Sequence, residues 1–361
     1  EQQKGKSSGP HVARIRRERS RARLSCCTHV EQIPCIERVS LSVGAYRTDE
    51  GKPWVLPSIL EAEKRVLAKG ADKEYLPITG LAPYIALARE FAMGADSPSI
   101  KENRCASVQT LSGTGACRVI AEFYTKFLGE HFADGKVPMY LPKPSWGNHA
   151  KIFATAGMDV RSYRYWDANT LGLDLEGMLE DLAHAPGGSA VLLHACAHNP
   201  TGVDPTKEQW DIISATLKQK KLAIFIDSAY QGFASGDAEA DAYAMRELEA
   251  DGHNYALSQS FAKNFGLYGE RVGTLSMICA SPEEAKRVES QLKLIIRPMY
   301  SSPPLAGARI VQEVLGDPAL CAQWRSECAI MANRIIDMRI ALKEALVKVG
   351  SSKNWDHITN Q

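Results

Sequence analysis

The sequence predicts an α/β fold in which a mainly parallel sheet is covered by helices on both faces. Short, continuously apolar segments at 190–195, 222–226 and 255–260 are typical of strands buried on both faces. Between them lie stretches with apolar residues at helical spacing, such as 208–219. This alternation indicates a parallel sheet, because each helix crosses from one strand to the next.

The remaining elements follow from the same patterns. Apolar runs predict further strands at 108–111, 137–141 and 160–165, and the segment 41–46 reads as extended. Helical spacing predicts helices over 58–68, with Ser58 as the candidate N-cap, and over 81–93, 116–128, 152–156, 175–183, 283–296 and most of 308–346. Residues 49–53 (D-E-G-K-P) have the composition of a turn.

Size and composition are those of a globular protein with one large or two medium domains. The chain has 361 residues, of which 45% are hydrophobic and 24% are charged. No apolar run is long enough to cross a membrane, and a net charge of +1 predicts no polyanionic partner. The nine cysteines have no metal-type spacing, so we expect no metal site and reduced thiols.

The first 40 residues differ in character from the rest. Residues 1–24 contain eight Lys and Arg against two Glu, so the remainder of the chain is net acidic. Such a segment fits a disordered or processed tail, the remnant of a transit peptide, or an arm that binds RNA. No aromatic residues interleave with the arginines, which argues against the RNA-binding alternative.

The segment 258–273 (S-Q-S-F-A-K-N-F-G-L-Y-G-E-R-V-G) is the clearest chemical signal. Lys263 lies among small, aromatic and glycine residues just after an apolar strand. Burial there lowers a lysine pKa and favours the neutral amine, which forms a Schiff base with an aldehyde. With Ser260 and Arg271 as phosphate ligands, the segment suits pyridoxal phosphate, which carries both groups. A surface loop containing a lysine and an arginine is the alternative.

Other polar residues also follow predicted strands. Asn199, Asp227 and Lys263 each come shortly after an apolar run, at the sheet edge where α/β proteins bind ligands. The turn Ser112-Gly113-Thr114-Gly115 links a strand to a helix, which aims backbone N–H groups at a phosphate. It is not a dinucleotide motif, and a plain helix cap remains the alternative.

The strand-end residues suggest how such a cofactor is held. Asp227, after five apolar residues, suits a protonated pyridine nitrogen, although an arginine partner is the alternative. Asn199 and Tyr230 can bond the phenolic oxygen, and Trp146 can stack on the ring or pack in the core. His149 and His194, taken singly, read as structural histidines.

From Val43 to about Ile358 the chain resembles the aspartate aminotransferases, pyridoxal-phosphate enzymes of fold type I. The resemblance covers nearly nine tenths of the chain, and its motifs occur in the order of the family: V-G-A-Y-R, E-Y-L-P-I, S-G-T-G-A, W-G-N-H, H-N-P-T-G-V-D-P, D-S-A-Y-Q-G-F, S-F-A-K-N-F-G and R-P-M-Y-S-S-P-P. It implies a large domain (41–320) with a mainly parallel seven-stranded sheet and a small α/β domain beginning at 321–361, here incomplete.

The resemblance also implies roles for individual residues. Lys263 binds the cofactor covalently and moves the proton, Asp227 pairs with the pyridinium supported by His149, and Trp146 covers the ring. The cofactor ligands are then Ser112, Gly113, Thr114, Trp146, Asn199, Asp227, Tyr230, Ser260, Lys263 and Arg271. Tyr75 reaches the phosphate in the neighbouring subunit, Arg297 pairs across the dimer with the substrate side-chain carboxylate, and Gly44 lines the substrate side.

The implied activity is transfer of the amino group from aspartate to 2-oxoglutarate in a homodimer, in the cytoplasm or in an organelle matrix if the N-terminus is a targeting remnant. We expect dicarboxylic amino acids and 2-oxo acids as partners, and no nucleic acid or membrane. Two departures matter. The sequence stops before the family's C-terminal arginine that binds the α-carboxylate, with no arginine after Arg339, and residues 1–40 do not match the family's N-terminal arm. The alternatives are a truncated cofactor-binding chain with little activity and an aromatic or neutral amino-acid aminotransferase.

Overall fold

The computed structural model of the chain describes residues 44–360, which fall into two compact units that divide between Pro53 and Trp54. The described part of the first unit contains a turn, in which the Gly51 N–H donates to the Thr48 carbonyl at 2.9 Å. The Thr48 N–H in turn donates to the Lys52 carbonyl at 2.9 Å, so the predicted turn is confirmed. Residues 41–43 of the predicted extended segment 41–46 lie outside the described residues, and residues 44–46 form no strand.

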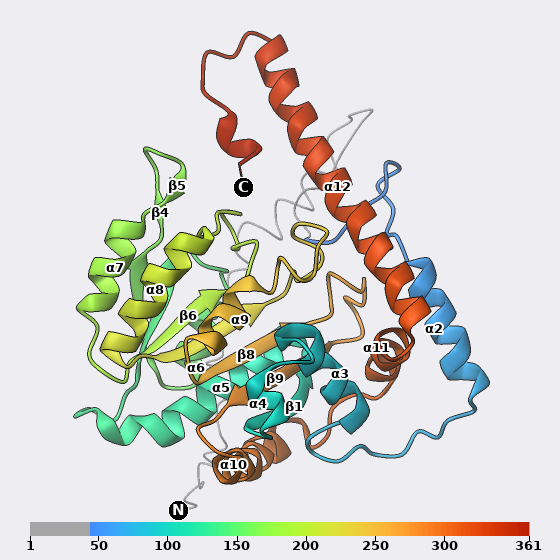
Figure 1. The fold of residues 1–361 in the computed structure, drawn as a ribbon, viewed down its shortest axis with the longest axis vertical. Helices are drawn as coiled ribbons and strands as arrows, with labels where there is room; N and C mark the ends of the chain where they lie inside the picture. The colour runs from blue at the N-terminus through green and yellow to red at the C-terminus, as the bar shows by residue number, and fades with distance from the viewer. Residues whose placement is uncertain (1–43, 361) are drawn as a thin grey trace, which may run out of the picture. The chain divides into compact units, whose positions relative to one another are not determined.

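The second unit is built on a seven-stranded sheet with the order β1-β9-β8-β7-β6-β2-β3 (Figure 1). The strands from β3 to β8 in this order pair in parallel, whereas β9 runs antiparallel to both β8 and β1. The mainly parallel seven-stranded sheet is therefore confirmed. The strands are β1 (Cys105–Leu111), β2 (Pro138–Lys143), β3 (Asp159–Arg164), β6 (Ala190–His194), β7 (Ala223–Ser228), β8 (Tyr255–Ser260) and β9 (Val272–Ile278), and β4 (Trp166–Asp167) and β5 (Gly172–Leu173) form a separate pair.

The helices cover the sheet and extend beyond it. The structure has α2 (Pro57–Ala68), α3 (Ala82–Met93), α4 (Pro98–Lys101), α5 (Ser112–Leu128), α6 (His149–Thr155), α7 (Leu175–Ala183), α8 (Lys207–Lys220), α9 (Tyr243–Ala250), α10 (Pro282–Tyr300), α11 (Ala306–Gly316) and α12 (Pro318–Lys348), with short 3₁₀ turns at Gly129–His131 and Asp356–Ile358. We predicted from the sequence that Ser58 is the N-cap of α2, and this prediction is wrong. Leu56 holds that position without a side-chain hydrogen bond, because Pro57 already begins the helix.

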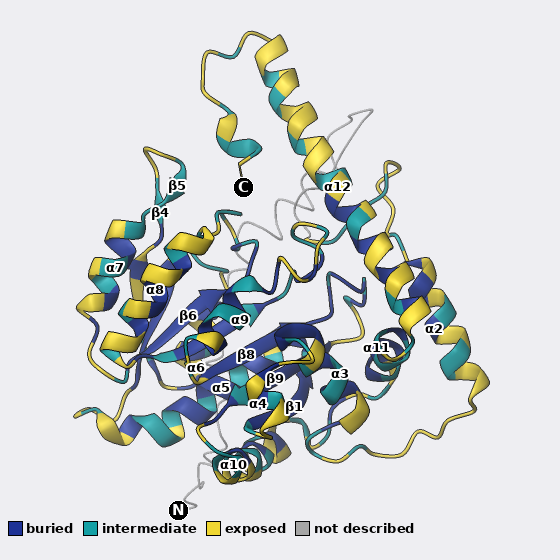
Figure 2. Ribbon diagram, viewed as in Figure 1, coloured by how far each residue is buried: buried dark blue, intermediate teal, exposed yellow. Residues whose placement is uncertain are grey.

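Two hydrophobic cores lie on opposite faces of the sheet. Leu192 and Phe225 pack in one core with residues of α5, α6 and α10. Val191 and Ile224, their neighbours in the same strands, pack in the other with residues of α3, α7, α8 and α9. Both faces of the central strands are therefore buried, which is why their sequences are continuously apolar (Figure 2).

Helix α12 begins against α2 and continues into solvent. Near its start the buried Glu327 carboxylate accepts bonds from the Ser58 N–H at 3.1 Å and from the Ser58 hydroxyl. Farther along, Ile336, Ile340 and Leu342 are exposed, and much of this part of α12 is coloured as exposed in Figure 2. The helix crosses residues 320 and 321 without a break, and the domain boundaries drawn from the resemblance stay a prediction.

Two sequence predictions concern the chain as a whole. Within residues 44–360, none of the helices has both the length and the apolarity needed to cross a membrane. The cysteines of the same residues are all free thiols, which agrees with the expectation of reduced cysteines.

Gly273 of β9 permits a close approach of three backbone segments. A Cβ atom at this position would lie 2.5 Å from the Gln259 carbonyl oxygen and 2.6 Å from the Ser112 carbonyl carbon. Because both are backbone atoms, we expect Gly273→Ala to lower the free energy of unfolding by about 1–3 kcal/mol. Urea denaturation checks this against Gly269→Ala, where a Cβ meets nothing within 4 Å. Equal stability of the two variants would contradict the packing argument.

Candidate active site

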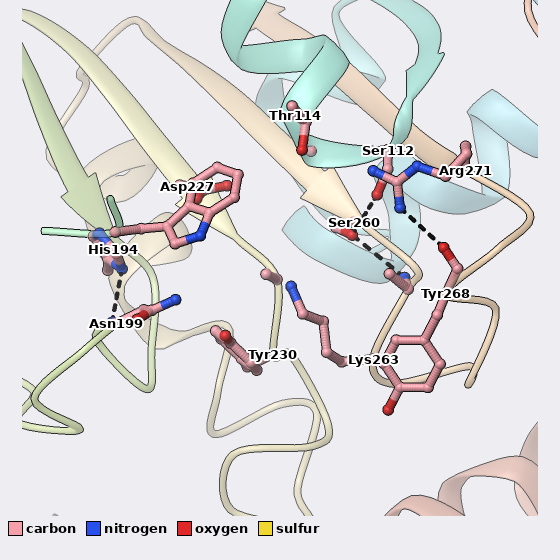
Figure 3. Close-up of a pocket in the computed structure, with 14 residues that line it drawn as sticks. Ser112, Thr114, His194, Asn199, Asp227, Tyr230, Ser260, Lys263, Tyr268 and Arg271 are labelled. Carbon is pink, nitrogen blue, oxygen red and sulfur yellow. Dashed lines mark hydrogen bonds between the residues drawn. The ribbon is translucent and has the colours of Figure 1, made fainter. Parts of the chain in front are cut away.

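A cavity of about 230 Å³ opens at the carboxyl edge of the sheet (Figure 3). Strands β6, β7 and β8 are parallel and end together at this edge, and β1 ends there too because β9 lies antiparallel between β1 and β8. The side chains that follow these strand ends form the wall. The lining residues are Ser112, Gly113, Thr114, Trp146, His194, Asn199, Asp227, Ala229, Tyr230, Ser260, Ala262, Lys263, Tyr268 and Arg271.

All ten residues predicted from the sequence as cofactor ligands within one chain line this cavity: Ser112, Gly113, Thr114, Trp146, Asn199, Asp227, Tyr230, Ser260, Lys263 and Arg271. Tyr75 and Arg297 do not line it. Both are exposed, and 92% of the Tyr75 surface is accessible. Gly44 belongs to the separate N-terminal unit. The roles of these three residues stay predictions.

Lys263 lies in the loop after β8, and its amine extends into the cavity (Figure 3). Its Nζ lies 5.1 Å from the centre of the Tyr230 ring. Burial lowers the pKa of this lysine; Asp227 opposes the shift and the Arg271 guanidinium adds to it. A lowered pKa raises the fraction of neutral, nucleophilic amine, as the sequence argument required.

One end of the cavity is arranged to bind an anion. Helix α5 begins at Ser112, and its N-cap residue, Leu111, makes no side-chain cap bond, while the Ser112 N–H donates to the Arg271 carbonyl at 3.1 Å. The Ser112 hydroxyl lies 2.8 Å from that of Ser260. The Arg271 guanidinium, held by the Tyr268 carbonyl at 3.0 Å, lies at the same end (Figure 3). Hydroxyls, a guanidinium and helix N–H groups together are a typical phosphate site.

Gly113 keeps this end of the cavity open. A Cβ atom on Gly113 would lie 3.3 Å from the Ser260 Cβ and 3.6 Å from Asp227 Oδ1. It would therefore stand between the anion-binding end and the Asp227 carboxylate. Ser112, directly before it, has a φ of +59°, a strained conformation for a residue with a side chain. This backbone conformation at Ser112 turns the chain sharply from β1 into α5.

Asp227 marks the other end of the cavity. It pairs with His194 in the register of β6 and β7, and its Oδ2 lies 3.2 Å from His149 Nε2. The other ring nitrogen of His149 lies 2.9 Å from the Ser145 hydroxyl. Burial, the largest single effect, raises the pKa of the carboxyl, but the His149 hydrogen bond and the charges of the neighbouring histidines and Lys263 together outweigh it and hold the pKa below its usual range. Asp227 is therefore a carboxylate that suits a cationic ring nitrogen.

His194 lines the cavity although the sequence did not single it out for this role. Its Nδ1 accepts a hydrogen bond from the Asn199 N–H at 3.3 Å. Burial lowers the pKa of His194 to about 3, with His149 lowering it further and Asp227 opposing. A neutral imidazole thus fixes the backbone of Asn199. The sequence places His194 at the end of an apolar strand, and the structure shows that it lies next to Asp227 in the sheet.

These groups fit pyridoxal phosphate. The uncapped helix with Ser112, Ser260 and Arg271 suits its phosphate, Asp227 suits its ring nitrogen, and the Lys263 amine suits its aldehyde. The donors lie at separate ends of one cavity, with the amine between them (Figure 3). The chemistry of the donor set therefore agrees with the cofactor that the sequence predicted.

Comparison with known proteins decides the family. A model of the family described as aminotransferase class I and II matches residues 36–361. The chain belongs to this family. Its membership confirms the prediction of a fold-type I aminotransferase that uses pyridoxal phosphate.

Relatives within the class I and II aminotransferases are highly similar to the chain. The cytoplasmic aspartate aminotransferase of Oryza sativa subsp. japonica is 54% identical over 91% of this chain and 79% of its own length. The mitochondrial enzyme of Xenopus tropicalis is 52% identical over 90% of this chain and 75% of its own. The crystal structure of an aromatic-amino-acid aminotransferase from Burkholderia pseudomallei, covalently bound to pyridoxal phosphate, has a TM-score of 0.93 and 40% identity, covering 97% of this chain and 86% of that one. These matches do not favour the alternative of a truncated chain without transaminase activity.

Proposed function

We propose that this aminotransferase moves the amino group of L-aspartate to 2-oxoglutarate, giving oxaloacetate and L-glutamate. The observation that carries the proposal is the Lys263 amine placed in one cavity between a carboxylate and an anion-binding end. Identity above 50% to aspartate aminotransferases supports the choice of substrate. The resemblance places 2-oxoglutarate as the second substrate of the same site.

The residues of the cavity have different roles in the proposed reaction. When bound, pyridoxal phosphate supplies an aldehyde that takes up the amino group and a ring that accepts electrons from the substrate carbon. Lys263 Nζ would hold the cofactor in place and, as a free amine, would carry the proton from the substrate carbon. Asp227 keeps the ring nitrogen protonated, and Asn199 and Tyr230 bond the phenolic oxygen. Trp146 covers the ring and excludes water.

Arg271 is assigned to the cofactor phosphate. Replacing it with glutamine removes a charge-assisted hydrogen bond of about 1.5–3 kcal/mol. We therefore expect Arg271→Gln to raise the dissociation constant for pyridoxal phosphate by about 10- to 100-fold, measured by fluorescence or absorbance titration. Arg161→Gln is a suitable control, because Arg161 pairs with Asp159 on β3. Unchanged affinity in Arg271→Gln would remove Arg271 from the phosphate site.

We further propose a homodimer with shared active sites, in which Tyr75 and Arg297 act in the cavity of the partner subunit. Their exposure, away from the cavity of their own chain, supports this assignment. If the sites are shared, a homodimer of the Lys263→Ala variant and a homodimer of the Arg297→Ala variant are each inactive, because both of their sites lack one required residue. A mixture of the two variants, unfolded and refolded together, then forms heterodimers with one intact site. We expect the mixture to recover up to about a quarter of wild-type turnover; recovery of none would contradict sharing.

A comparison of substrates tests the reaction itself. The purified chain with pyridoxal phosphate is supplied with 2-oxoglutarate and either aspartate or phenylalanine. Because a bidentate guanidinium selects a second carboxylate, we expect kcat/KM for aspartate to exceed that for phenylalanine by about 10²-fold or more. A preference for phenylalanine would instead support an aromatic aminotransferase, the activity of the Burkholderia pseudomallei relative.

The compartment of the protein remains a prediction. The curated relatives include both mitochondrial and cytoplasmic enzymes. The arginine-rich segment on which a targeting signal was predicted lies in residues 1–43, outside the described part of the chain. We keep the cytoplasm and an organelle matrix as the two candidates.

A further inference from the structure

Three side chains with metal-binding atoms meet behind the cavity. They are Cys117 on α5, His149 at the start of α6 and Asp227 at the end of β7. One ligating atom from each lies within 4.8 Å of the other two. Cys117 and His149 are buried and do not line the cavity, whereas Asp227 does.

The geometry of this cluster, Cys117–His149–Asp227, is close to that of a zinc site. His149 Nε2 and Asp227 Oδ2 are 3.2 Å apart. Two ligands at about 2.0–2.1 Å from a tetrahedral zinc ion are separated by about 3.3 Å, so this edge needs almost no movement. A thiolate binds zinc at about 2.3 Å, so Cys117 Sγ, which lies within 4.8 Å of the other two ligand atoms, has to approach by at most roughly an ångström. The fourth position is left for water.

The surroundings also suit a metal ion. The Ser145 hydroxyl, 2.9 Å from His149 Nδ1, can accept the imidazole N–H when Nε2 binds a metal, which is the usual outer-shell arrangement. One thiolate and one carboxylate balance the two charges of the ion, so no net charge is buried. The Cys, His and Asp set, with its soft sulfur, favours zinc over magnesium or calcium.

We propose that Cys117, His149 and Asp227 form a zinc site that inhibits the enzyme. On binding, the Cys117 thiol loses its proton to solvent, and the proton of His149 moves from Nε2 to Nδ1. No electrons are transferred. The bound metal then neutralises the negative charge that the Asp227 carboxylate presents to the cavity. The inhibition, but not the binding of metal, rests on the role proposed for Asp227.

Metal content and a cobalt spectrum test the site directly. The full chain is produced with pyridoxal phosphate in medium supplemented with Zn²⁺ or Co²⁺ and purified without chelators. We expect about one metal ion per chain and, with Co²⁺, a thiolate-to-metal charge-transfer band. Cys117→Ala should lose the band and bind metal about 100-fold more weakly or worse. Cys105→Ala, which removes a buried thiol on β1 bonded to Ser107, should keep both the bound metal and the charge-transfer band.

A second variant tests the site without changing α5. Ser145→Ala removes only the outer-shell partner of His149 and should weaken metal binding about 10- to 100-fold. Metal that stays bound in Cys117→Ala, a cobalt spectrum without the charge-transfer band, or no bound metal in the wild type each overturns the site.

The inhibitory effect has its own readout. Removing zinc from the wild-type holoenzyme should raise aspartate turnover by at least about tenfold, because the Asp227 carboxylate regains its negative charge. Bound zinc with unchanged turnover would refute inhibition while leaving the site in place. The turnover of metal-free enzyme reports separately on the proposed transamination.

Discussion

Lys263→Ala is expected to lower aspartate transamination by about four orders of magnitude, because both the covalent attachment of the cofactor and the proton carrier are lost. The cavity offers no replacement of the same kind: Lys263 is its one lysine among the described lining residues. The coupled assay of oxaloacetate formation measures the loss. Lys136→Ala, which changes an exposed lysine ahead of β2, is the control and should keep wild-type activity.

A further measurement separates the chemical role of Lys263 from a role in folding. Pyridoxal phosphate should still bind to the Lys263→Ala variant through the Ser112, Ser260 and Arg271 end of the cavity. It should, however, be removable by dialysis and leave no adduct after borohydride reduction. Turnover near the wild-type rate in this variant would refute the assignment of Lys263.

Asp227→Asn is expected to lower kcat by about 10²–10³-fold, because the fixed negative charge that keeps the ring nitrogen protonated is lost. The change preserves shape, so the free energy of unfolding should change much less than kcat. His149→Gln, which removes the imidazole that lies 3.2 Å from Asp227 and 2.9 Å from the Ser145 hydroxyl but leaves the carboxylate in place, should lower kcat by about tenfold. If Asp227→Asn and His149→Gln had equally small effects, the carboxylate would not carry the charge assigned to it.

The same carboxylate gives a pH prediction. Its pKa is held below the usual value, so the folded state binds its proton less tightly than the unfolded state. The stability that Asp227 contributes is therefore present above the ordinary aspartate pKa and is lost as the pH falls through the lowered one. Wild type and Asp227→Asn should converge in stability under acid conditions, which unfolding curves at a series of pH values can measure.

The central strands and the site residues were predictable because both follow from burial in the sheet. Strands β6, β7 and β8 have apolar residues on both faces, and Tyr255–Ser260 was placed with its observed ends. Parallel strands end at one edge, so polar residues just after them had to meet. This reasoning alone brought Asn199, Asp227 and Lys263 together.

Other elements depend on contacts that the sequence does not show. Strand β9 follows the turn at Arg271 and includes Gly273, so the segment reads as a loop until its pairing with β1 and β8 is seen. Helix α5 begins at Ser112 rather than at 116, because the tertiary structure holds Ser112 at a positive φ that local preferences disfavour.

Parts of the site likewise lay beyond local patterns. His194 ends an apolar strand, and its place in the cavity wall became evident only from its register with Asp227 in the sheet. Cys117, His149 and Asp227 come from three elements and have no metal-type spacing, so a search for spacing in the sequence could not reveal this cluster. Arg297, which we propose acts in a partner subunit, is exposed and does not line the cavity of its own chain, so a local pattern does not connect it to the site.

The most direct test of the central claim is the absorbance spectrum of the 361-residue chain with pyridoxal phosphate, recorded before and after excess aspartate is added. Attachment to Lys263 gives a visible band, and transfer of the amino group to the cofactor removes it as oxaloacetate forms. We predict both changes. A visible band that persists in excess aspartate, with no oxaloacetate, would contradict the proposed transamination while leaving the cofactor site intact.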